Sequence, residues 1–149
     1  MTGPRFYSKL LAIYFPEKHL RASATAILPA PKPASNAMVL SKATVRAARL
    51  LAFSQRELAR ILGVSDATAS RLFAGRYQLS PERAKEWELA LLLVRLFRSL
   101  DALWGHEVAA HKWLASNNLA LAARPVDLLH SVEGLVRVVN YLDSARGRL

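Results

Sequence analysis

Two histidines and a glutamate in the second half of the chain have the residue types that bind metal ions. They are His106, Glu107 and His111. A zinc hydrolase helix places its two histidines four residues apart, so that both face one ion. Here the histidines are five residues apart, which turns them about 140° from each other around a helix. The spacing therefore favours a surface or interhelical role for these histidines, and we expect neither a metal nor a cofactor.

The rest of the sequence also lacks a catalytic pattern. The chain has no cysteine, which excludes thiol catalysis, disulfides and cysteine-based zinc sites. It contains no glycine-rich phosphate loop, and no serine lies in a nucleophile-elbow context. Hydrophobic residues make up 52% of the chain, enough for a core, but the longest apolar run, residues 89–94, is far too short to span a bilayer. We therefore expect a cytoplasmic protein that is not an enzyme and that works by binding.

The charge distribution along the chain suggests two kinds of partner. The 149 residues have a net charge of +10. Residues 1–40 carry five basic and one acidic side chain, residues 41–100 carry eleven and five, and residues 101–149 carry five of each. A basic surface attracts polyanions, most often nucleic acid, whereas the neutral last third suits protein contact. General solubility is the alternative explanation for the positive charge.

Residues 54–73 have the pattern of two short helices joined by a tight turn. Ser54 and Glu57 have the spacing of a capping box, and Gly63 is placed to end the first helix. Ala59 is small where the second helix would cross the first. The apolar side chains predicted to face the shared core are Leu58, Leu62, Val64, Ala69 and Leu72. This pattern resembles the helix-turn-helix of Xre-type regulators.

The resemblance implies that the second helix enters the major groove of DNA. Arg71 is the candidate for reading a guanine edge, since the arginine fork matches the guanine acceptors. Arg56, Arg60 and Arg76 are predicted phosphate contacts, which position a protein without reading bases. Asp66 opposes phosphate unless it serves the helix N-terminus. A pure packing role for the two helices is the alternative. The candidate DNA-binding residues are Arg56, Ser65, Ala67, Thr68, Ser70, Arg71 and Arg76.

A second pattern follows from residue 113 onward. It consists of Trp113-Leu114, the asparagine turn 116–118, the block Pro125-Val126-Asp127-Leu128-Leu129, and Glu133-Gly134 before a stripe of valines and leucines. The order and spacing resemble the toxin-binding domain of the Xre/MbcA/ParS antitoxin family, with alanines at 122 and 123 where glycines are usual. With the helix-turn-helix included, the resemblance covers residues 41–149.

The resemblance implies a function that the residues alone do not show. Such proteins are antitoxins of RES–Xre modules, whose partner is a RES-domain toxin that depletes NAD. The antitoxin covers the active-site cleft of the toxin and represses its own operon through the helix-turn-helix. The residues assigned to toxin binding on this basis are Trp113, Asn118, Arg124, Pro125, Asp127, Tyr141, Arg146 and Arg148.

The two arginines near the end of the chain add a specific expectation. Arg146 and Arg148 flank a glycine, and the arginine fork suits a pocket built for dinucleotide phosphates. We expect this basic tail to enter the toxin. A frayed, solvated terminus is the alternative.

The elements that position these residues are predicted to be helices, which gives an all-α fold: an Xre-like helix-turn-helix bundle followed by a small helical toxin-binding domain. Ser80 and Pro81 have the types of an N-cap and a first helical residue. Pro125 is likewise placed to begin a helix, and Gly134 to let helices approach closely. The expected helices span residues 45–53, 55–62, 66–74, 81–104, 106–115, 125–130 and 132–145.

The sequence divides into three expected regions. Residues 1–40 form an N-terminal arm or linker, with a short amphipathic helix expected over 6–15 and an extended, proline-rich linker over 24–37. Whether this segment is a mobile arm or a helix that docks on a partner stays open from the sequence. Residues 41–100 form the helix-turn-helix region, and residues 101–149 the toxin-binding domain. The helix beginning near residue 83 is apolar on more than one side, which predicts a homodimer.

Two other functions remain open from the sequence. One is a stand-alone Xre-type transcriptional regulator whose C-terminal module dimerises. The other is a localisation or partition protein of the ParS-like branch.

Overall fold

The structure is a computed structural model that describes residues 35–105 and 107–147. Within this part of the chain it has seven helices and one isolated antiparallel bridge, between Asn118 and Ala123. The all-α prediction is confirmed. The predicted helix over residues 6–15 lies outside the described residues. The helices are α2 (Asn36–Leu50), α3 (Gln55–Leu62), α4 (Asp66–Phe73), α5 (Ala84–Trp104), α6 (Glu107–Ala115), α7 (Pro125–Leu128) and α8 (Val132–Arg146).

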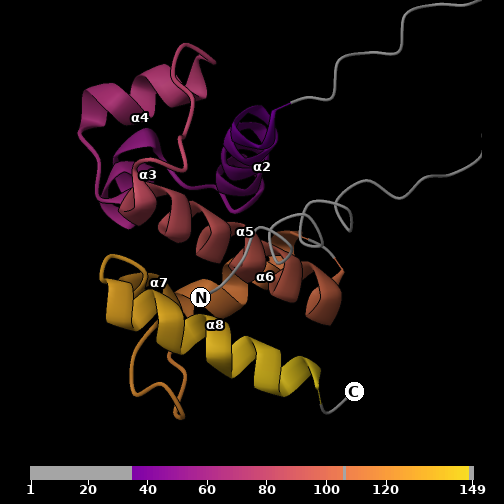
Figure 1. Cartoon of the computed structure of the whole chain (residues 1–149). Coiled ribbons are helices and arrows are strands. Elements are labelled where there is room, and N and C mark those ends of the chain that lie inside the picture. The colour runs from indigo at the N-terminus through magenta and orange to yellow at the C-terminus, as the bar shows by residue number, and fades with distance from the viewer. Residues whose placement is uncertain (1–34, 106, 148–149) are drawn as a thin grey trace, which may run out of the picture.

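Helix α5 is the central element of the fold. It packs against α2 and α3 on one side and against α6 and α8 on the other (Figure 1). Its buried residues join both groups in one continuous core, from Leu40 of α2 through Leu93 to Leu142 of α8. The expected boundary between residues 100 and 101 therefore falls inside a helix that both halves share. The single chain already buries eight residues of α5, among them Trp87, Leu93 and Leu100, so the apolar character of this helix does not by itself require a second copy.

Helix α2 begins nine residues before the predicted start at residue 45. The Ser35 hydroxyl caps it by accepting a hydrogen bond from the backbone N–H of Met38 at 3.2 Å. Leu40, Thr44 and Ala47 recur every three or four residues and are buried against the core. The proline-rich composition suggested an extended chain up to residue 37, and this prediction is wrong for Asn36 and Ala37 because the apolar stripe extends the helix to Asn36.

Helix α5 begins later than predicted. Residues 81–83 form a turn, and Arg83 precedes the helix with non-helical angles of φ −95° and ψ 70°. The Arg83 guanidinium lies over the Tyr77 ring and donates to the Tyr77 hydroxyl, which donates to Glu86 at 2.6 Å. This cluster fixes the turn where the Ser80-Pro81 pattern predicted a helix. The predicted end of the helix is confirmed, because Gly105 follows Trp104 with φ +66°.

Candidate functional site

The helix-turn-helix has the local geometry that the sequence predicts. The Ser54 hydroxyl accepts from the Glu57 N–H at 3.1 Å, and the Glu57 carboxylate accepts from the Ser54 N–H at 2.7 Å, so the capping box is complete. Hydrogen bonding by the side chain and then by the backbone of Ser54 lowers the pKa of Glu57 below its usual value. Gly63 ends α3 with φ +65°, a conformation that favours glycine.

Burial separates the two faces of the motif. Leu58, Leu62, Ala69 and Leu72 are buried as predicted, and Val64 is half-buried against the same core. Ala59 is also buried where α3 packs on α4. The opposite face of α4 is therefore left for solvent or a ligand.

The exposed face of α4 carries the predicted DNA-binding residues. Ala67 and Arg71 are exposed, whereas Thr68 and Ser70 are half-buried. The Arg71 side chain folds along its own helix, donating to the Ala67 carbonyl and to the Thr68 hydroxyl, each at 3.3 Å. The Thr68 hydroxyl also lies 2.9 Å from the hydroxyl of Ser65. Arg71 must therefore leave these contacts before it reaches a base edge.

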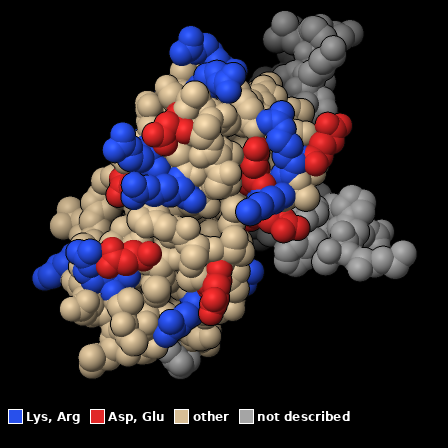
Figure 2. Space-filling view, turned by 90° about the vertical axis from the view of Figure 1, so that its left-hand side faces the viewer, with Lys and Arg blue, Asp and Glu red and all other residues tan. Residues whose placement is uncertain are grey.

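Arg56 has a partner within the motif. It forms an ion pair with Asp66 at 3.7 Å, and both side chains are well exposed. Asp66 lies in the first turn of α4, where a carboxylate is favoured, so its presence on this surface has a structural reason. Arg60 and Arg76 are exposed as predicted. Figure 2 shows basic and acidic side chains interspersed on the face that carries α3 and α4, so this face is not uniformly basic.

Beside the motif lies a basic groove that the sequence did not predict. Lys42, Arg46 and Arg49 recur at helical spacing on α2 and line a hollow of about 480 Å³ whose apolar wall includes Leu72 and Phe73 of α4. Arg49 donates to the Phe73 carbonyl at 3.3 Å and lies over its ring. The i, i+4, i+7 spacing of the three cations is visible in the sequence, but the helix was predicted to begin only at residue 45.

The second candidate site begins with the loop between α6 and α7. Asn118 pairs with Ala123 across the loop, donating from its N–H to the Ala123 carbonyl at 3.0 Å. Its side-chain oxygen accepts from the Leu121 N–H at 3.1 Å. Ala122 has φ +51°, which explains why glycine is usual at this point of the related pattern. Asn118, predicted to bind the toxin, is therefore half-buried and holds the loop.

The start of α7 places an exposed ion pair beside this loop. Arg124 donates to both oxygens of Asp127, at 2.7 and 2.9 Å. Asp127 raises the pKa of the Arg124 guanidinium further above its usual value. Pro125 begins α7 as predicted, but it is buried and offers a partner little surface. The helix ends at Leu128, short of the predicted His130.

Three aromatic rings from different helices form a row on the same half of the molecule. The centroid of Trp113 in α6 lies 5.3 Å from that of Trp104 in α5 and 6.0 Å from that of Tyr141 in α8, whose ring it stacks on. All three are half-buried, so Trp113 and Tyr141 both pack and present an edge. Arg146 is exposed at the end of α8, and Arg148 lies outside the described residues. The predicted toxin-binding residues thus form two groups, one at the loop and α7 and one on α6 and α8.

A polar contact fixes α8 to α5. The Asp143 carboxylate pairs with Arg95 and accepts from the buried Ser99 hydroxyl at 2.8 Å. Ser99 and Asp143 are 44 positions apart in the chain, and no local sequence pattern predicts their contact. The contact holds the helix that ends in Arg146.

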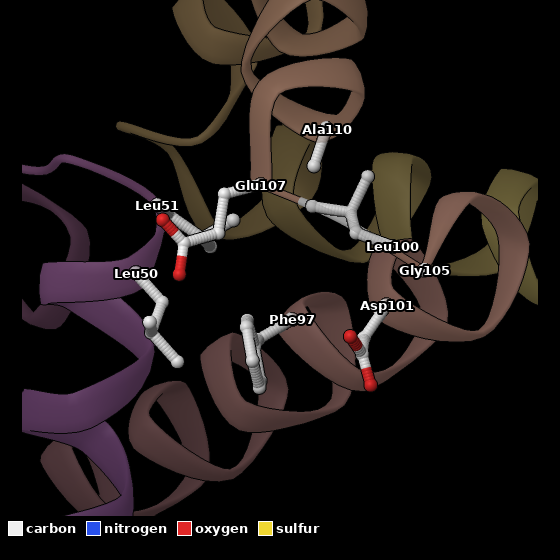
Figure 3. A pocket seen from close by; sticks show the side chains of 8 residues that line it. All are labelled: Leu50, Leu51, Phe97, Leu100, Asp101, Gly105, Glu107 and Ala110. Carbon is white, nitrogen blue, oxygen red and sulfur yellow. The ribbon is translucent and has the colours of Figure 1, made fainter.

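A hollow of about 370 Å³ lies where α2, α5 and α6 meet. Figure 3 shows Leu50 and Leu51 on one side, Phe97 and Asp101 of α5 on the other, and Glu107 beside them. The lining residues include two carboxylates but neither a nucleophile nor a histidine. Among the described residues no group of three His, Cys, Asp or Glu side chains is arranged to hold a metal.

His111 has the interhelical role that its spacing predicted. Its Nε2 lies 2.8 Å from the carbonyl oxygen of Leu50 at the end of α2. His106 lies outside the described residues. In the part of the chain that the structure describes, no helix is both long and apolar enough to cross a membrane.

Comparison with known families agrees with this two-part architecture. Residues 31–95 match the antitoxin Xre-like helix-turn-helix domain, and residues 99–148 match the antitoxin Xre/MbcA/ParS C-terminal toxin-binding domain. A search of the curated proteins finds no match. The fold and the two matches define an antitoxin that combines a helix-turn-helix with a toxin-binding module. The chain belongs to the Xre/MbcA/ParS type of antitoxin.

Proposed function

We propose that this antitoxin binds a RES-domain toxin, covers the active-site cleft of that toxin and so prevents depletion of NAD. The observation that carries the proposal is the match of residues 99–148 to a toxin-binding domain, which takes in all of α6, α7 and α8. In combining this module with an Xre-type helix-turn-helix, the chain resembles the antitoxins of RES–Xre modules. Covering a cleft needs a stable interface and no chemistry from this chain, with about 800 Å² buried on each partner.

The rigid placement of α8 supports a blocking role for the tail. Arg146 is exposed at the end of a helix that Asp143 fixes to α5. An exposed guanidinium at the end of a fixed helix suits a site that binds the phosphates of a dinucleotide, because its planar fork matches phosphate oxygens. In this proposal Arg146 and Arg148 enter the cleft while the loop and the aromatic row contact its rim.

The helix-turn-helix supports repression of the antitoxin's own operon. Arg71 is proposed to read a guanine and Arg56, Arg60 and Arg76 to contact phosphates. The proposed state on DNA is a homodimer, since two motifs read the two half-sites of an operator. Both proposed activities belong in the cytoplasm, where operator DNA and NAD are found.

A stand-alone regulator with a dimerising C-terminal module is the second candidate. Val132 and Val136 favour it, because they lie one turn apart on α8 and are 51% and 36% exposed. Such a pair suits contact with a second copy.

Co-expression with the protein encoded by the adjacent reading frame tests the proposal. We expect the neighbour alone to lower cellular NAD and arrest growth, and we expect this chain to bind it and restore both. If the two proteins do not associate, the regulator becomes the leading candidate and operator mapping follows.

A further inference from the structure

The loop between α6 and α7, residues 117–123, holds its shape through its own contacts. The Asn118 backbone N–H donates to the Ala123 carbonyl, and the Asn118 side-chain oxygen accepts from the Leu121 N–H. The Ala122 N–H donates to the Leu119 carbonyl at 3.2 Å. Leu121 fixes it to the core, with only 3% of its surface exposed. The loop therefore has one defined arrangement, in which Leu121 points inward and Leu119 does not.

Leu119 is exposed to an unusual degree for a large apolar residue in an ordered loop. Its exposed fraction is 97%, against 75% for Val108, the next most exposed large apolar residue in the described part of the chain. Burial of a leucine side chain stabilises a folded protein, and the loop gains none of this stabilisation at position 119. Because hydrogen bonds within the loop fix its shape, Leu119 is held in this exposed position.

The residues around Leu119 are uncharged, which indicates what kind of partner surface the loop can contact. Residues 117–123 contain no charged side chain, although the chain as a whole carries +10. The nearest charge that follows in the sequence, Arg124, is engaged by Asp127 in a two-bond pair. An uncharged tip with an apolar end suits the desolvated centre of a protein interface and does not suit phosphates.

We propose that Leu119 is the anchor of the toxin interface and inserts into an uncharged apolar recess on the surface of the toxin. The inference rests on the proposed function for the identity of the partner. The 117–123 loop lies inside the matched toxin-binding domain, and its tip is ordered before the partner arrives. A preordered anchor loses little conformational entropy on binding, and its removal acts mainly on the dissociation rate.

The test compares Leu119→Ser with the matched control Val108→Ser, which removes another exposed apolar side chain at the far end of α6 from the loop. The probe is the purified protein encoded by the adjacent reading frame, and its association and dissociation rates are measured on immobilised full-length antitoxin. We expect Leu119→Ser to weaken binding at least about tenfold, mainly through faster dissociation, and Val108→Ser to change it by less than about twofold. Both variants are expected to keep the wild-type melting temperature, because neither side chain is buried.

The outcomes separate this inference from the proposed function. If wild type and Leu119→Ser bind the toxin equally well, the anchor is refuted while the antitoxin function stands. If the wild type does not bind the toxin, both are refuted.

A second measurement shows whether the loop tip contacts the toxin or a second copy of this chain. Because the chain has no cysteine, Ala120→Cys places a single environment-sensitive dye beside the tip and keeps Leu119. We expect its emission to shift when the toxin is added and to stay constant when the labelled antitoxin is concentrated alone. A shift on concentration alone assigns the tip to self-association and overturns the proposal.

Discussion

Gly134 of α8 lies so close to the Leu128 carbonyl that no side chain fits between them. A Cβ at position 134 would be 2.1 Å from the Leu128 oxygen and 2.9 Å from its carbonyl carbon. The contact packs the start of α8 onto the end of α7 and confirms the close approach that Gly134 predicted.

The contact makes Gly134→Ala destabilising. The Cβ meets backbone that no side-chain rotation relieves, so we expect a loss of about 3 kcal/mol in the free energy of unfolding, measured by urea denaturation. The control is Gly147→Ala, whose Cβ would lie 3.5 Å from the Asp143 carbonyl oxygen in ordinary contact. Equal stabilities for the two variants would show that α7 and α8 pack less closely than the structure has them.

Ala122→Gly is expected to stabilise the protein. Ala122 holds φ +51°, which is strained for a residue with a Cβ. Glycine removes that strain but loses more backbone entropy on folding, so the expected gain is about 0.5–1 kcal/mol. Ala120→Gly, at an equally exposed position with negative φ, is expected to destabilise by about 0.5 kcal/mol. The two melting temperatures should therefore move in opposite directions, and movement in the same direction would argue against a left-handed Ala122.

The capping box gives a pH dependence with a defined sign. Its hydrogen bonds lower the pKa of Glu57 in the folded state below the usual 4.5, so the ionised carboxylate contributes stability above that pH. The contribution is lost as the pH falls through the folded-state pKa. Glu57→Gln keeps the capping contact and removes only the charge. At pH 7 we expect a loss below about 1 kcal/mol, because the site is partly exposed.

This loss should shrink as the pH falls below 4.5. The measurement is the unfolding free energy of the wild type and the variant from pH 7 to pH 3, with the exposed Glu88→Gln as the control. A gap between wild type and Glu57→Gln that stays constant over this range would contradict the assignment.

The sequence predicted the local structure well where a cap or a glycine marks a helix end. Ser54, Gly63 and Gly105 each act as their types indicated, because the signal lies within a few residues of the feature. It failed at Ser80-Pro81, where the Arg83–Tyr77–Glu86 cluster forms a turn, and at the start of α2, where burial against α5 extends the helix.

The candidate sites were predictable only where the interacting residues are close together in the sequence. Arg124 and Asp127 are three residues apart, and their pairing is visible in the sequence. The contact of Asp143 with Arg95 depends on how two helices far apart in the sequence pack, so a single sequence does not show it. The inward position of Leu121 and the outward position of Leu119 follow from the Asn118 contacts and not from residue type.

Arg71→Ala tests base reading by the recognition helix. Arg71 is exposed and bonded only to its own helix turn among the contacts described, so its removal should leave the fold intact. We expect a loss of about 1–3 kcal/mol on operator DNA and a much smaller loss on random DNA. Arg137→Ala on α8 serves as the control for lost charge. An equal loss on both DNAs would reduce Arg71 to a phosphate contact.

Deletion of residues 146–149 tests the blocking tail. We expect this truncation to weaken inhibition of the toxin more than it weakens binding, because α8 remains fixed to α5 by Asp143. Affinity and NAD turnover are measured on the same preparation. Full inhibition by the truncated chain would exclude the tail from the active site.

Titration of the purified toxin with this chain, with NAD consumption followed throughout, tests whether the antitoxin blocks the active site of the toxin. We expect NAD consumption to fall in proportion to the antitoxin added and to stop once the toxin is saturated. Undiminished NAD consumption by a toxin that is demonstrably bound would contradict a blocking antitoxin.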